Sequence, residues 1–126
     1  MRLVLDAGAL VALERNDRAM WRRFKAAFVR GEIPLTHGGV VGQVWRARGP
    51  RQALLASALA GVEVRPLDDQ RGRAAGALLV RARQSDVIDA AVVLLAEDGD
   101  RIVTSDLDDL EFLAAASGRH IELVPA

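Results

Sequence analysis

The sequence of 126 residues contains no cysteine. This absence excludes disulfide-stapled folds, thiolate zinc sites and cysteine nucleophiles. No apolar run reaches the ~18 residues that a membrane-spanning helix needs. An acid, Asp6, follows the first methionine too closely for a secretory signal peptide. We therefore expect a cytoplasmic protein with no membrane partner.

Lysine is nearly absent too, since 16 of the 17 basic residues are arginine, and 17 acids bring the net charge to zero. The charges are unevenly distributed. Residues 1–83 hold 15 Arg/Lys and 7 Asp/Glu, whereas residues 84–126 hold 2 and 10. Because arginine makes bidentate contacts with phosphate, this division favours a polyanionic partner such as nucleic acid. Solvated arginines scattered over the surface are the alternative explanation.

Short strand-like apolar runs alternate with longer helical ones, which predicts an α/β fold. The length suits one domain, residues 1–126, and the hydrophobic fraction of 51% is that of a globular protein. Helical crossovers between strands predict a mainly parallel five-stranded sheet with helices on both faces. Strands are expected over 3–5, 33–36, 62–65, 101–104 and 121–124, and helices over 9–15, 17–31, 39–48, 50–61, 69–83, 87–96 and 110–116.

Acidic residues follow two of the expected strands. Asp6 comes after 3–5, and Asp106 comes just after 101–104. Ligands of parallel sheets bind beyond the carboxyl ends of the strands, so both carboxylates enter one crevice if these strands are neighbours. Asp89 interrupts an apolar helix, where a carboxylate is costly to bury without compensation. Turn-forming roles for the first two acids and a solvent-directed Asp89 are the simpler alternative.

Carboxylates that converge in a crevice repel one another and acquire raised pKa values unless a counter-charge is present. Mg²⁺ or Mn²⁺ removes this repulsion, because such hard cations prefer carboxylate oxygens. A site of this kind supports hydrolysis of a phosphodiester. Asp86 lies three residues before Asp89 on the same helix face and is a further candidate ligand, although an N-cap role also explains it.

Three segments resemble the acidic blocks of the PIN domain: 3–10 (LVLDAGAL), 86–96 (DVIDAAVVLLA) and 102–106 (IVTSD). Taken in order over essentially the whole chain, they are most similar to the VapC-like toxin ribonucleases of toxin–antitoxin pairs. The resemblance implies a PIN-like domain that acts as a Mg²⁺- or Mn²⁺-dependent endoribonuclease, is often a homodimer, and is held inactive by a cognate antitoxin. It also implies that Asp6, Asp89 and Asp106 are the catalytic metal ligands.

The sequence departs from the family at one site position. The family usually places a glutamate on the helix after the second strand, where this chain has Gln43. An amide forms hydrogen bonds but supplies neither negative charge nor a base. Asp86 is expected to substitute in part, and Asp108 or Asp109 to lie near the mouth of the site. The alternative function is therefore a catalytically impaired PIN-like protein that binds RNA or an antitoxin.

Several other residues carry weaker expectations. Thr104 and Ser105 either hydrogen-bond to the site or complete the turn before Asp106. Without cysteine partners, the histidines are expected in turns or at the surface rather than on a metal. The candidate RNA-backbone contacts are Arg46, Arg48 and Arg51, and the histidines are His37 and His120.

An aspartate that accepts a phosphoryl group would also stand at the end of a strand. A receiver-like domain needs a lysine late in the chain, yet Lys25 is the only lysine. A haloacid-dehalogenase-like nucleophile usually lies in Asp-x-Asp, which Asp6-Ala7-Gly8 does not match. This third class ranks below the metal-dependent nuclease and the binding protein.

Overall fold

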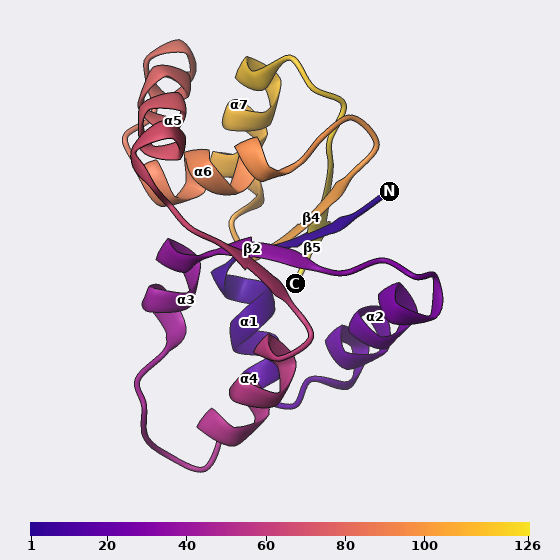
Figure 1. Ribbon diagram of the computed structural model, residues 1–126. Helices are drawn as coiled ribbons and strands as arrows, with labels where there is room; N and C mark the ends of the chain where they lie inside the picture. Colours follow the sequence, from indigo (N-terminus) through magenta and orange to yellow (C-terminus); the bar gives the residue numbers. More distant parts are fainter.

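The computed structural model describes residues 1–126 and contains five strands and seven helices (Figure 1). In chain order they are β1 (Leu3–Leu5), α1 (Ala7–Glu14), α2 (Arg18–Val29), β2 (Leu35–His37), α3 (Gly38–Val44), α4 (Gln52–Leu59), β3 (Glu63–Arg65), α5 (Asp69–Ala82), α6 (Val87–Leu95), β4 (Arg101–Thr104), α7 (Leu107–Ser117) and β5 (Glu122–Pro125).

The strands form one sheet in the order β3-β2-β1-β4-β5, and every neighbouring pair is parallel. Figure 1 shows the sheet between two helical layers, with α5, α6 and α7 on one side and α1, α3 and α4 on the other. The predicted fold class is confirmed, and the sheet is parallel throughout rather than mainly so. None of the helices combines the length and apolar character needed to cross a membrane.

The central strand β1 is apolar at every position, and all three of its residues are buried. A strand with helices on both faces must be apolar on both sides, which explains the continuous run. Side-chain oxygens of aspartates accept hydrogen bonds from backbone N–H groups at the starts of α2, α5 and α6. The capping residues are Asp17, Asp68 and Asp86, and for Asp86 this is the N-cap role considered from the sequence.

The helix expected to reach residue 48 ends earlier, at Val44. Trp45 has an extended backbone, and the Gln52 carboxamide oxygen accepts hydrogen bonds from the Arg46 and Ala47 backbone N–H groups at 2.9 and 2.7 Å. This clamp fixes a loop where the sequence pattern predicts a continuing helix. The next helix begins later than expected, at Gln52, because Pro50 belongs to that loop rather than to the first helical turn.

Other boundaries also differ from the prediction by one to three residues, and two of these bear on the site or the sheet edge. Helix α7 begins at Leu107 rather than near residue 110, so its first turn includes Asp108 and Asp109, whose charges complement the helix dipole. Strand β2 begins at Leu35, two residues later than expected, and Ile33 is 61% exposed outside the sheet. The earlier start of α7 brings an additional carboxylate to the end of β4.

Candidate metal centre

The centre is built around the carboxyl ends of two neighbouring strands. β1 pairs with β4 in parallel register, with Leu5 opposite Val103. Asp6 directly follows β1, and its backbone N–H donates to the Val103 carbonyl at 3.0 Å. The sequence predicts that Asp6 and Asp106 enter one crevice if the strands before them are neighbours. These strands are neighbours, and both acids follow them at the same edge of the sheet.

Helix α6 supplies the third acid. Asp89 lies in its first turn and is only 7% exposed, in a helix whose other buried residues are all apolar. Asp86 caps the same helix, and its Oδ1 accepts hydrogen bonds from the Ile88 and Asp89 backbone N–H groups at 2.9 and 3.1 Å. This capping role, the alternative considered from the sequence, engages one oxygen of an exposed side chain.

Three carboxylates approach one another closely. Asp89, Asp106 and Asp109 each offer an oxygen, and these oxygens all lie within 4.8 Å of one another. Such a set of hard oxygen donors suits Mg²⁺ or Mn²⁺. The donor chemistry and the spacing therefore fit the metal that the sequence predicts.

The carboxylate of Asp6 is held beside this group by Thr104, which is fully buried. The Thr104 hydroxyl donates to Asp6 Oδ2 at 2.8 Å and accepts a hydrogen bond from the Asp106 backbone N–H at 2.9 Å. Asp6 Oδ1 accepts from the Ala7 N–H at 2.8 Å. The structure thus shows both roles considered for Thr104, because its hydroxyl donates to Asp6 and also completes the turn before Asp106.

A close approach of backbone fixes the turn that carries Asp106. A Cβ atom added to Gly8, in the first turn of α1, would lie 2.7 Å from the Ser105 Cβ and 2.8 Å from the Ser105 backbone nitrogen. Any side chain at residue 8 would therefore displace the β4–α7 turn. Residue 8 must be glycine because a side chain would collide with Ser105, and not because its backbone φ is positive.

The acids raise one another's proton affinity. Burial raises the pKa of Asp89 to about 7, and repulsion from Asp86, Asp6, Asp106 and Asp109 acts in the same direction. Burial and the neighbouring Asp109 also raise the pKa of Asp106, although a hydrogen bond with Asp89 opposes this rise. No cation contributes to either shift. The cluster therefore carries negative charge that no side chain compensates, as expected for a cation site.

The other predicted residues lie outside the cluster of close carboxylates. Gln43 is exposed on the last turns of α3. The Arg46 guanidinium donates to the carbonyls of Trp45, Gly42 and Gln43 at 2.7, 3.2 and 3.0 Å, so it covers the end of α3. Arg48 and Arg51 are exposed in the loop that follows.

The histidines differ from each other. His120 is exposed, whereas His37 is fully buried where β2 meets α3, so a surface role is wrong for His37. Its Nε2 donates to the Ile88 carbonyl at 3.1 Å, and its Nδ1 accepts from the Gly39 N–H at 3.0 Å. Burial lowers the pKa of His37 and favours the neutral ring. With both nitrogens engaged, His37 ties α3 to the helix that carries Asp89.

Sequence reasoning undervalued Asp109, which it placed only near the mouth of the site. The signal was its position three residues after Asp106, because the side chains of an N-cap residue and of the third helical residue lie close together. This signal depends on a helix that begins at residue 107, and the predicted helix begins near residue 110.

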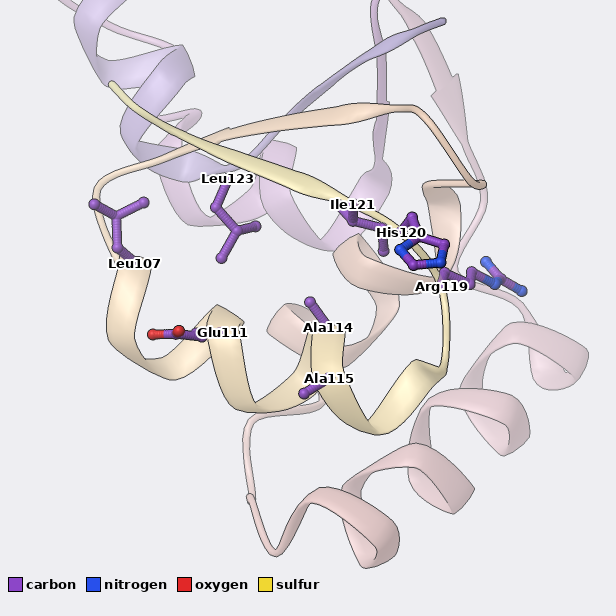
Figure 2. A pocket seen from close by; sticks show the side chains of 8 residues that line it. All are labelled: Leu107, Glu111, Ala114, Ala115, Arg119, His120, Ile121 and Leu123. Carbon is purple, nitrogen blue, oxygen red and sulfur yellow. The ribbon is translucent and has the colours of Figure 1, made fainter.

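The apolar hollow in Figure 2, about 510 Å³ between α7 and β5, is lined by Glu111 but by none of the clustered carboxylates.

No protein-family model matches the sequence, and no curated protein matches it. Among solved structures, the chain resembles the crystal structure of VapBC2 from Rickettsia felis bound to a DNA fragment from their promoter. The TM-score is 0.71 at 12% sequence identity, and the match covers 98% of each chain. At this identity the similarity concerns the fold, and it confirms the PIN-like architecture expected from the three acidic blocks.

Proposed function

We propose that this chain is a Mg²⁺- or Mn²⁺-dependent endoribonuclease of the VapC toxin type. The observation that carries the proposal is the group of carboxylates at the ends of β1 and β4, with three oxygens mutually within 4.8 Å. Asp89, Asp106 and Asp109 would hold the ion, and Asp6 would supply a fourth carboxylate beside them. Asp86 is a weaker candidate ligand because one of its oxygens caps α6.

A bound ion supplies Lewis-acid chemistry for hydrolysis of a phosphodiester. The residues of the chain would divide the remaining tasks. Thr104 fixes the orientation of Asp6 through a hydrogen bond of 2.8 Å. Asp89, whose pKa is raised to about 7, exchanges a proton near neutral pH and would lose it when the ion binds. Exposed arginines would bind the RNA backbone, with Arg48 and Arg51 less engaged within the chain than Arg46.

The proposed partners follow from the same assignment. RNA is the substrate, a cognate antitoxin would inhibit the enzyme, and a homodimer is the expected assembly. The resemblance to the VapBC2 structure supports an antitoxin partner, since that structure contains a complex. A cytoplasmic location and a single domain spanning residues 1–126 remain part of the proposal.

The test is RNA cleavage by a matched pair of variants. Asp108 and Asp109 are adjacent and both exposed, but only Asp109 has an oxygen in the carboxylate cluster. With Mn²⁺ present, Asp109→Asn should lower the cleavage rate by about 10²-fold or more, whereas Asp108→Asn should cleave as the wild type does. Equal rates for the two variants would remove Asp109 from the site. Wild-type protein that cleaves no RNA with either metal would contradict the nuclease proposal.

A second candidate function is favoured by one observation. Gln43 is exposed, neutral and absent from the carboxylate cluster, so this chain lacks the acid expected from α3. A PIN-like protein with impaired catalysis would bind RNA or an antitoxin without cutting. Under this function the protein retains RNA in a binding assay with Mn²⁺ and releases no shorter fragments.

A further inference from the structure

A row of basic side chains runs along the exposed face of α2. Arg18, Arg22 and Lys25 follow one another at four and three residues, so they lie on one stripe of the helix. All three are exposed, and none forms an ion pair with a carboxylate within 4.0 Å or donates a side-chain hydrogen bond within the chain. The N-cap, Asp17, is the nearest acid in sequence, and its Oδ1 accepts from the Met20 N–H.

This arrangement opposes helix stability, because like charges at such spacings repel each other by a few tenths of a kcal/mol per pair. The sequence of α2 contains no acidic residue that would relieve the repulsion. Uncompensated departures from local rules are most often found at functional positions. The stripe is thus suited to contact with an anionic partner, whose negative charge would relieve the repulsion between these cations.

The stripe borders a hollow that also contains an aromatic ring. Arg18, Arg22 and Lys25 line a hollow of about 450 Å³ together with Trp21 and, from α4, Leu54. The indole of Trp21 is half-buried and held in place, since its Nε1 donates to the Leu13 carbonyl at 3.1 Å and its ring contacts Phe24 edge-on. A fixed aromatic surface beside several cations is the combination that binds single-stranded nucleic acid, by base stacking and phosphate contact.

We infer that the α2 face, defined as Arg18, Trp21, Arg22 and Lys25, binds single-stranded nucleic acid. The stripe from residue 18 to residue 25 is about 10 Å long, at 1.5 Å per residue. This length corresponds to roughly two or three successive phosphates of one strand. A duplex keeps its bases stacked inside, so only an unpaired strand offers a base to Trp21. The choice of RNA over DNA rests on the proposed function.

The test uses two double variants with the same change of charge. Arg18→Gln/Arg22→Gln alters the α2 face, and Arg81→Gln/Arg83→Gln alters exposed cations at the end of α5. Binding of a fluorescein-labelled oligouridylate is followed by anisotropy in EDTA, which keeps divalent ions away from the acidic cluster. The first variant should bind about tenfold more weakly or worse, and the slope of log K against log salt should fall by ~1.4. The second variant should bind almost as the wild type does.

A stacking readout separates nucleic acid from an acidic protein partner. In a Trp45→Phe background, Trp21 is the only tryptophan, and oligouridylate should quench its fluorescence. Equal weakening in both double variants, or no weakening in the first, would overturn the inference. Binding of poly-glutamate with similar affinity and without quenching would also overturn it in favour of an acidic peptide. No metal is needed for this binding, so the two proposals can fail separately. If the wild type binds oligouridylate through the α2 face but cleaves no RNA, this inference is supported and the nuclease is contradicted. If the wild type cleaves RNA and Arg18→Gln/Arg22→Gln binds oligouridylate as tightly as the wild type does, the nuclease is supported and this inference is overturned.

Discussion

Asp89 is the residue whose environment is least favourable to its own charge. Burial raises its pKa to about 7, against about 3.9 in an unfolded chain. The folded state therefore binds a proton more tightly than the unfolded state does. This contribution to stability is complete below about pH 4 and is lost as the pH rises through about 7.

Asp89→Asn should consequently stabilise the metal-free protein at about pH 8, by on the order of 2 kcal/mol or roughly 5–10 °C in melting midpoint. The advantage of the variant should shrink towards about pH 5, where wild-type Asp89 is protonated and neutral. Thermal unfolding in EDTA across this range measures both effects. Parallel pH profiles for the two proteins would mean that Asp89 ionises freely.

Gln43 provides a second prediction at this scale. If its side chain borders the metal site, Gln43→Glu should tighten Mn²⁺ binding by about tenfold, because one more negative charge attracts the ion. Gln70→Glu, on an exposed position of α5, is the matched control and should leave the affinity unchanged. Isothermal titration with Mn²⁺ compares them. An identical affinity for both variants would place Gln43 outside the site.

At the scale of elements, the contact between α1 and the β4–α7 turn determines where Asp106 lies. Gly8→Ala should destabilise the protein by about 1–3 kcal/mol, because the added methyl group collides with Ser105 backbone. Gly76→Ala, inside α5, meets no atom within 4 Å and should stabilise the protein by about 0.5–1 kcal/mol. Urea unfolding of the two variants tests the pair. Destabilisation of equal size in both would show that the Ser105 contact is unimportant.

The sequence predicts elements well where a local signal is strong. Leu3–Leu5 is apolar throughout and forms the central strand, and the aspartate caps mark where α2, α5 and α6 begin. The end of α3 could not be predicted in this way. It depends on Gln52, a residue of the next helix, whose side chain clamps the Arg46 and Ala47 backbone. Tertiary contacts of this kind leave no periodic pattern in the sequence.

The candidate site was predictable to a similar extent. Strand-end positions identified Asp6 and Asp106, and an acid in an apolar helix identified Asp89. Their proximity depended on β1 and β4 being neighbours, which the strand order now establishes. Asp109 was undervalued because its role depends on where α7 starts. Of the two positions expected for His37, the surface is wrong because the ring is buried against the Ile88 carbonyl, whereas the residue does lie at the junction of β2 and α3, where it accepts from the Gly39 N–H.

Across the whole molecule, the division of charge along the sequence corresponds to two separate regions. Three acids of the C-terminal third, Asp89, Asp106 and Asp109, meet at one edge of the sheet, where Asp6 joins them. Much of the positive charge of residues 1–83 lies on exposed helix and loop positions, including the α2 face. A net charge of zero thus conceals a candidate metal centre and, separately, the exposed cations of the α2 face that we propose as a nucleic-acid contact.

The measurement that tests this account most directly is a Mn²⁺ titration followed by thermal unfolding. An ion that binds only the folded state stabilises it by about 2.7 kcal/mol at a hundred times its Kd. We predict a rising midpoint for the wild type and for Asp108→Asn, and no rise for Asp106→Asn/Asp109→Asn. A wild-type midpoint that stays constant in millimolar Mn²⁺ would contradict the metal centre and, with it, the proposed ribonuclease.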